Sequence, residues 1–195
     1  MRLILVLLLV SIVGMVLMTG NSVSAKGKGG NDVNLVGRES GDFKVSSGGG
    51  DDVNGARQNS GGFKATSGGG DDINFASTNG GKFKVSSGGG DDGNVAFKTA
   101  GVKISSGGGD DINTLQYIGG DVKVSSGGGN DFIQGHDLTG AVKINAGGGD
   151  DTMFDVASSS GSKTKVNCGG GYDTVYSVTP SPDTKILKNC ENIIN

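Results

Sequence analysis

Apolar and polar residues alternate around a series of evenly spaced lysines. Most of these lysines have an apolar residue on each side, as in Phe43-Lys44-Val45 and Val122-Lys123-Val124. This period of two is typical of a strand that buries one face and exposes the lysine on the other. The lysines are Lys44, Lys64, Lys84, Lys103, Lys123, Lys143 and Lys165. The pattern predicts seven similar strands, about 20 residues apart.

An aspartate follows each of these lysines at a constant distance of eight residues, after a glycine triplet such as Gly48-Gly49-Gly50. The invariant aspartates are Asp32, Asp52, Asp72, Asp92, Asp111, Asp131, Asp151 and Asp173. Successive members are 19 to 22 residues apart, and all variation in length lies between an aspartate and the next lysine. The segment from lysine to aspartate is therefore under a geometric constraint on its length, and the rest of the repeat is not.

A second short strand is predicted after each aspartate, as in the segment Ile73-Asn74-Phe75-Ala76. Two strands and two turns in about 20 residues make one coil of a solenoid, and such coils must stack because none buries its apolar face alone. The predicted fold is all-β, a parallel β-solenoid (a β-roll or β-helix) of about seven 20-residue coils. The repeats span 26–166, and 167–195 form the last coil and a C-terminal cap.

The position two residues after each aspartate is polar in the first coils and apolar in the last three. Its occupants are Asn34, Asn54, Asn74, Asn94, Asn113, Ile133, Met153 and Val175. If it points inward, the asparagines form an internal ladder of amide hydrogen bonds; if it points outward, neighbours such as Val53 and Ile73 fill the core. The apolar members favour the inward ladder.

Composition and charge narrow the class of protein. Glycine accounts for 40 of the 195 residues, but its fixed period excludes a flexible linker and the lack of a three-residue repeat excludes collagen. The formal net charge is −3, and no block of like charge indicates a nucleic-acid partner.

The N-terminal segment has the pattern of a secretory signal peptide. Arg2 precedes a long apolar run, and a small-x-small ending at Val23 and Ala25 predicts cleavage after Ala25, so that residues 1–25 are removed. The alternative is an uncleaved membrane anchor. Either way the repeats would lie outside the cytosol, and after cleavage no membrane span is predicted.

The glycine–aspartate turns have the chemistry to bind a hard cation. Glycine carbonyls can turn toward an ion because glycine leaves φ unrestricted. Stacked coils place successive carboxylates about 4.8 Å apart, where they repel each other unless a cation lies between them. Calcium takes six to eight oxygen ligands, and a set made only of oxygens disfavours transition metals. We therefore predict one row of Ca²⁺ ions, up to about seven between adjacent coils.

The predicted ligands lie in the glycine–aspartate turns, and they include the eight invariant aspartates. The other predicted ligands are the preceding acidic or amide residues Asp51, Asp71, Asp91, Asp110, Asn130 and Asp150, and the glycines Gly48, Gly50, Gly68, Gly70, Gly88, Gly90, Gly107, Gly109, Gly127, Gly129, Gly147 and Gly149. The alternative is a solvated acidic edge. An invariant aspartate beside a variable neighbour favours calcium, because solubility alone would not distinguish the two columns.

The segments 127–135 (Gly-Gly-Gly-Asn-Asp-Phe-Ile-Gln-Gly) and 171–176 (Gly-Tyr-Asp-Thr-Val-Tyr) resemble the RTX, or hemolysin-type, calcium-binding repeat G-G-x-G-x-D-x-U-x. The resemblance implies a β-roll whose glycine turns bind calcium. We also expect the chain to fold only where calcium is available, because so glycine-rich a chain buries too little to offset its ordering entropy. Two departures are clear: the chain has one glycine turn per coil instead of two, which implies one row of ions, and serine replaces the first family glycine in most repeats. These serines are Ser47, Ser67, Ser87, Ser106 and Ser126.

The lysine column has two interpretations. One is a solvated face that prevents association with other sheets. The other is a face that binds an anionic polysaccharide or cell-surface polymer, with the neighbouring serine, threonine and asparagine column supplying hydrogen bonds. Ice binding is a weaker third alternative, because the outer column is mostly lysine and serine rather than threonine.

The chain has two cysteines and one histidine, all in its C-terminal half. Cys168 and Cys190 are the only cysteines, and in a secreted chain they are expected to pair and to tie the cap over the last coil. His136 is the sole histidine, and irregular residues such as Asp155 are not expected to cluster with other polar groups. We therefore predict that the chain is not an enzyme.

Overall fold

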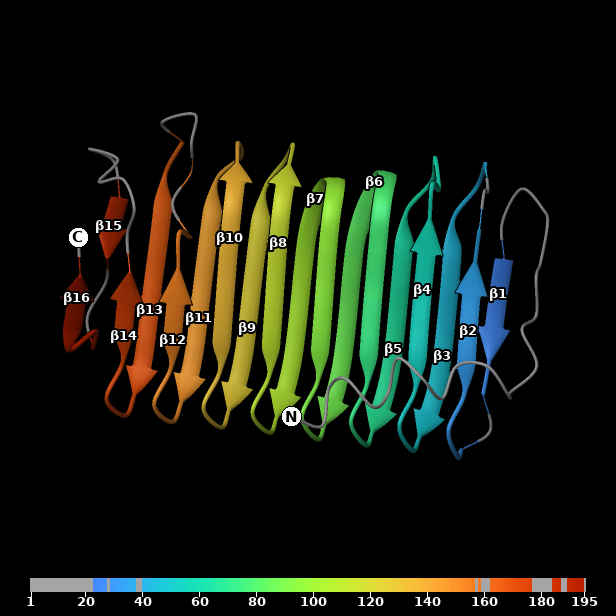
Figure 1. Ribbon diagram of the computed structural model, residues 1–195, viewed down its shortest axis with the longest axis horizontal. Helices are drawn as coiled ribbons and strands as arrows, with labels where there is room; N and C mark the ends of the chain where they lie inside the picture. The colour runs from blue at the N-terminus through green and yellow to red at the C-terminus, as the bar shows by residue number, and fades with distance from the viewer. Residues whose placement is uncertain are drawn as a thin grey trace.

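The computed structural model describes residues 23–27, 29–37, 40–156, 158, 162–176, 184–186 and 189–194. This part of the chain contains no helix and forms a parallel β-solenoid of about seven turns of about 20 residues (Figure 1). The predicted fold class is confirmed. Within the same residues, no helix is long and apolar enough to cross a membrane.

Each coil contributes a strand to each of two opposed sides. The lysine side contains β1 (Val23–Lys26), β3 (Phe43–Gly49), β5 (Phe63–Gly69), β9 (Val122–Gly128), β11 (Val142–Gly148), β13 (Thr164–Gly170) and β15 (Thr184–Ile186). The second side contains β2 (Val33–Val36), β4 (Val53–Arg57), β8 (Ile112–Ile118), β10 (Phe132–Leu138), β12 (Thr152–Phe154), β14 (Thr174–Tyr176) and β16 (Asn192–Ile194). The long strands β6 (Ile73–Gly89) and β7 (Gly93–Gly108) contribute to both sides.

All strand pairs are parallel and in register, so equivalent residues of successive coils lie beside one another. Lys44 pairs with Lys64, and Lys64 pairs with Lys84. The same register continues through β7, β9, β11 and β13. The only shift between β6 and β7 falls between Asn79 and Lys82, in the part of the repeat whose length varies.

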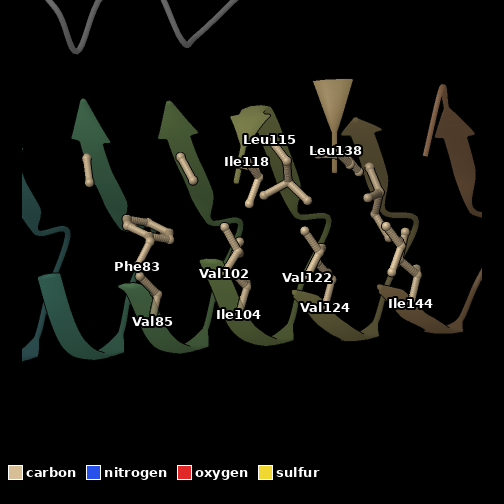
Figure 2. Close-up of a cluster of buried hydrophobic side chains, with 14 of the residues drawn as sticks. Phe83, Val85, Val102, Ile104, Leu115, Ile118, Val122, Val124, Leu138 and Ile144 are labelled. Carbon is tan, nitrogen blue, oxygen red and sulfur yellow. The ribbon is translucent and has the colours of Figure 1, made fainter. Parts of the chain in front are cut away.

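The core is a thin stack of inward side chains whose sizes compensate between the two sides. In the N-terminal coils, Phe43, Phe63 and Phe83 are buried together with small residues such as Ala76 and Ala96. Toward the C-terminus, valines replace the phenylalanines, and larger residues such as Leu115, Ile118 and Leu138 fill the space (Figure 2). This exchange keeps the interior densely packed while the backbone keeps one shape from coil to coil.

The first described strand overlaps the predicted cleavage site. Residues 1–22 lie outside the described residues, so the signal peptide stays a prediction. However, β1 begins at Val23, and Val23, Ser24 and Ala25 pair with Phe43, Lys44 and Val45. Cleavage after Ala25 would remove three of the four residues of this strand and expose the edge of β3.

Candidate functional site

The glycine triplets join the lysine side to the second side, and the stacking of coils explains two of their three glycines. In every triplet the first and third glycines have φ between +102° and +150°, which residues with a side chain rarely adopt. A Cβ on Gly107 would overlap the carbonyl oxygen of Gly88, and one on Gly109 would lie 2.5 Å from the carbonyl carbon of Gly90. These carbonyls are therefore directed along the solenoid axis at the next coil, and tight stacking alone demands glycine there.

The middle glycine of each triplet is different. Its φ lies outside the left-handed region, and a Cβ built on it would meet no atom within 4 Å. These residues are Gly49, Gly69, Gly89, Gly108, Gly128, Gly148 and Gly170. Neither backbone conformation nor packing within the coil accounts for glycine at this position.

The eight invariant aspartates form one row, half-buried at Asp32 and buried from Asp52 to Asp173, which we call the inner aspartate file. From Asp52 to Asp173 their exposure does not exceed 2%. Each accepts, on Oδ1, a hydrogen bond of 2.8 to 2.9 Å from the backbone N–H of the equivalent residue one coil earlier, as Asp111 does from Asp92. Their Oδ2 atoms are all buried and have no hydrogen-bond partner in the described structure.

Burial perturbs the ionisation of this file. It raises the pKa of Asp92 to about 8 and the pKa of Asp72, Asp111, Asp131 and Asp151 to about 7. The backbone N–H on Oδ1 opposes this increase in pKa, and for Asp72 the Ser67 hydroxyl also opposes it, whereas nearby carboxylates of the neighbouring coils add to it. The pKa values of Asp52 and Asp173, near the ends, are also raised by burial. The buried charge is therefore compensated only in part.

The residues that precede the invariant aspartates form an exposed row, the outer acidic file. Its members are Asn31, Asp51, Asp71, Asp91, Asp110, Asn130 and Asp150. Here the hydrogen bonds run in the opposite direction: each Oδ1 accepts a bond of 2.7 to 3.0 Å from the backbone N–H of the following coil. Accepting this hydrogen bond needs one side-chain oxygen and no charge, which explains why asparagine can replace aspartate in the outer file.

The last member of the outer position, Tyr172, fits the same explanation. Its N–H donates to Asp150, but no triplet coil follows that would need an acceptor from it. The inner file, in contrast, continues for one more step, since Asp173 N–H donates to Glu191 Oε2 at 2.9 Å. Glu191 was not among the predicted site residues, although Ile193 follows it by two residues just as Val175 follows Asp173.

The predicted asparagine ladder is confirmed. Asn54, Asn74, Asn94 and Asn113 are completely buried, and each amide nitrogen from Asn34 to Asn94 donates to the next asparagine Oδ1 at 3.0 to 3.2 Å. Ser87 Oγ also donates to Asn94, and the equivalent serines of the neighbouring coils repeat this contact. The serines that replace the first glycine of the RTX pattern thus have a structural role inside the coil.

The residues present fit a hard cation in part. The inner file supplies buried oxygen atoms without hydrogen-bond partners, and the side-chain and carbonyl atoms of the turn that could ligate a metal are oxygens, which Ca²⁺ prefers. In the part of the chain that the structure describes, no three His, Cys, Asp or Glu side chains converge on one point. An ion would therefore need backbone carbonyl oxygens of the glycine turns to complete its coordination.

Cys168 and Cys190 form the predicted disulfide, with their Cα atoms 5.2 Å apart. Cys168 occupies the inward position that Ser47 and Ala146 hold in earlier coils, so the bond links the core of the last coil to the segment before β16. A disulfide of this kind is compatible with an extracellular protein.

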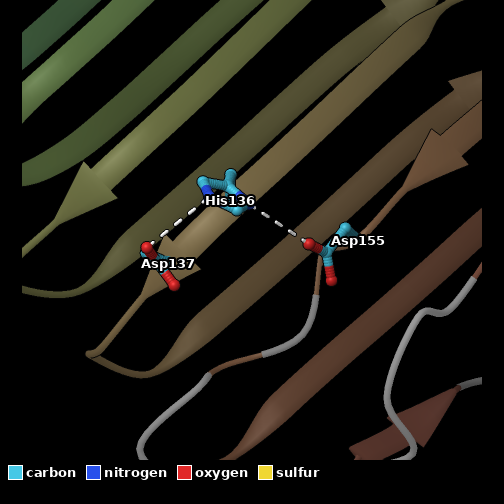
Figure 3. Close-up of polar contacts among 3 residues, drawn as sticks. All are labelled: His136, Asp137 and Asp155. Atoms are coloured by element: carbon cyan, nitrogen blue, oxygen red, sulfur yellow. Dashed lines mark ion pairs between the residues drawn. The ribbon is translucent and has the colours of Figure 1, made fainter.

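A small polar cluster lies outside the repeat pattern, where the C-terminal part of β10 adjoins the residue that follows β12 (Figure 3). His136 Nε2 is 3.5 Å from Asp137 Oδ2, and His136 Nδ1 is 3.6 Å from Asp155 Oδ2. The expectation that Asp155 stands apart from other polar groups is therefore wrong. The two carboxylates face opposite nitrogens of an imidazole ring that is half-exposed, so the three groups do not converge on one ligand.

Comparison with known proteins does not assign the chain to a family: no family model matches it, and no curated protein or solved structure does. The class of protein thus rests on the fold, a repeat solenoid with stacked files of carboxylates, amides and lysines.

Proposed function

We propose that the protein is a secreted calcium-binding repeat protein whose solenoid is stabilised by a row of Ca²⁺ ions along the inner aspartate file. The observation that carries this proposal is the row of eight buried Oδ2 atoms without a hydrogen-bond partner in the described structure. A buried carboxylate that lacks compensation must either take up a proton or bind a cation. We propose a binding and structural role for the chain, not catalysis.

Calcium is the cation that we propose, for two reasons. The available donors are carboxylate and carbonyl oxygens, which suit Ca²⁺ and do not select transition metals. The disulfide fits an oxidising compartment outside the cytosol, where modules with modest affinity, with Kd values of roughly 10⁻⁴ to 10⁻³ M, can be loaded with Ca²⁺.

The raised pKa values add a thermodynamic argument. Near neutral pH a proton and a cation compete for the same carboxylates, so Ca²⁺ would supply the compensation that protons supply at lower pH. Ca²⁺ should thus stabilise the fold most strongly above pH 8, where the carboxylates of the file are ionised.

The test combines calcium counting with thermal unfolding. After dialysis against millimolar CaCl₂, elemental analysis should find several ions per chain, and the unfolding temperature should exceed that measured in chelator. Asp111→Asn retains the Oδ1 acceptor but removes the charge, so it should reduce the number of bound ions. Asp121→Asn is the matched control, since it makes the same change at an exposed aspartate outside the predicted ligands, whose Oδ1 accepts a hydrogen bond from Ala141 N–H. No bound calcium together with identical unfolding in chelator would overturn the proposal.

A further inference from the structure

The lysine side presents one straight, uninterrupted line of positive charge. All seven lysines of the column are exposed, and each is paired in register with the lysine of the next coil. Neighbouring parallel strands lie about 4.8 Å apart, so the ammonium groups repeat at about this interval along the solenoid axis. We call this row the lysine file.

Carboxylates do not neutralise the lysine file. The ion pairs found among the described residues involve only His136 and its two aspartates. The exposed or half-exposed column two residues after the lysines is polar and uncharged, with the residues Ser46, Thr66, Ser86, Ser105, Ser125, Asn145 and Asn167. The column two residues before them carries two aspartates, Asp42 and Asp121, and two further lysines, Lys82 and Lys163, so it adds no net negative charge. Positive charges that repel each other along a line, with hydrogen-bonding groups beside them, form a surface complementary to a linear anion.

At its N-terminal end the lysine file borders a shallow cleft of about 280 Å³. The lining includes Lys44, Lys64, Lys82 and Lys84, and the glycines of the bends, Gly62 and Gly81, leave it open. Asp42 is the single carboxylate in this lining, and its Oδ1 already accepts a hydrogen bond from Gly62 N–H at 2.8 Å. Four ammonium groups against one carboxylate make this cleft a positively charged anchor for an anionic group on the file.

The repeat distance distinguishes between classes of polyanion. The interval of about 4.8 Å between strands is close to the length of one sugar residue in an extended polysaccharide. Each strand of duplex DNA carries a phosphate about every 3.4 Å, and its backbone winds away from a flat strip. The file also lacks exposed apolar side chains that could enter a lipid surface.

We propose that the lysine file and its polar neighbours bind an extended anionic polysaccharide along the solenoid axis. The sugar carboxylates or sulfates contact successive lysines, and the serine, threonine and asparagine side chains hydrogen-bond to hydroxyl groups. One anionic group occupies the cleft at Lys82. The site lies on a different part of the coil from the inner aspartate file, so it does not depend on bound calcium.

The test measures binding to heparin and hyaluronan, with neutral dextran as a reference, by isothermal titration calorimetry at low and at high salt. The folded protein should bind both anionic polymers but not dextran, and binding should weaken as salt rises. Lys103→Gln/Lys123→Gln should weaken binding roughly 25-fold, by analogy with the contribution of each lysine near an anionic surface. The matched control is Arg57→Gln/Lys98→Gln, which removes the same charge from the second side and should have little effect.

Several results would overturn the proposal. Equal losses in the two double variants would show that only bulk charge matters. Stronger binding to duplex DNA or to vesicles with anionic lipids than to either polysaccharide would assign the file to another class of partner. Salt-sensitive oligomers that occlude the lysines would assign it to a second copy of the chain. Loss of binding in chelator while circular dichroism shows an intact fold would also overturn it, whereas binding that is unchanged in chelator would support this proposal even if the calcium row is wrong.

Discussion

The glycine triplets allow a direct test of the fold, because neighbouring glycines in one turn have opposite structural requirements. Gly109 has a φ of +114° and stacks on Gly90. The φ of Gly108 lies outside the left-handed region, and the space where its Cβ would lie is open. We therefore compare Gly109→Ala with Gly108→Ala. The two variants have the same composition and lie in the same turn.

The expected magnitudes follow from backbone strain and steric overlap. Holding alanine in the conformation of Gly109 costs about 1–3 kcal/mol, and its Cβ would lie 2.5 Å from Gly90 C and 2.9 Å from Asp91 Oδ1. Relieving such an overlap in a packed stack costs another 1–3 kcal/mol or so. Gly108→Ala meets neither cost, and it should stabilise the protein by about 0.4–1 kcal/mol because it restricts the unfolded chain.

Urea denaturation followed by circular dichroism, in chelator, gives the two free energies of unfolding. We expect Gly109→Ala to lower the midpoint strongly and Gly108→Ala to leave it unchanged or raise it. Equal destabilisation by the two substitutions would refute the stacking argument, as would a neutral Gly109→Ala. An unchanged m-value in both variants would show that they are compared in the same two-state transition.

Three further predictions concern the core of the solenoid and its end. In chelator, the free energy of unfolding should fall as pH rises from about 4 to about 8. The pKa values of the inner aspartate file are raised toward 7 to 8, so the folded state binds more protons than the unfolded state in that range. Urea midpoints that rise with pH would contradict this. Asn94→Ala should cost about 1–3 kcal/mol, since it leaves buried partners of the ladder unpaired, whereas Asn34→Ala at the half-buried end should cost less in the same urea assay. Replacing Cys168 and Cys190 by alanine should cost about 3 kcal/mol and should speed amide hydrogen exchange in β14 and β16 but not in β7; uniform exchange along the chain would argue against a local cap.

Much of this architecture could be predicted from residue spacing, because a parallel in-register solenoid converts every column of the repeat into a row in space. The lysine flanks predicted the inward side of one strand, and the apolar residues Ile133, Met153 and Val175 predicted the inward position of the asparagine ladder. Both follow from the two-residue period of a strand, which needs no knowledge of the turns.

What spacing could not predict is the direction of hydrogen bonds at the turn. In the inner file each backbone N–H donates to the aspartate of the following coil, and in the outer file each N–H donates to the side chain of the preceding coil. These two directions depend on backbone torsions that glycine leaves unrestricted. Because glycine torsions are unrestricted, the sequence also could not predict that the carbonyls of the first and third glycines face the next coil. Glu191 was missed because its longer side chain replaces aspartate outside the strict spacing.

The middle glycines bear most directly on function. In all seven triplets this residue is glycine, although the structure leaves room for a side chain. Two nearby exposed columns vary between repeats, as in Ser46, Thr66 and Asn145, or Asp110 and Asn130, so exposed positions close to the turn have been free to diverge. A constraint that the coil itself does not impose must come from something that approaches the turn, on the edge where both acidic files lie. A cation held there, with its remaining ligands drawn from glycine carbonyls, would impose such a constraint, and Gly108→Ala would then weaken the stabilisation by calcium while leaving stability in chelator intact.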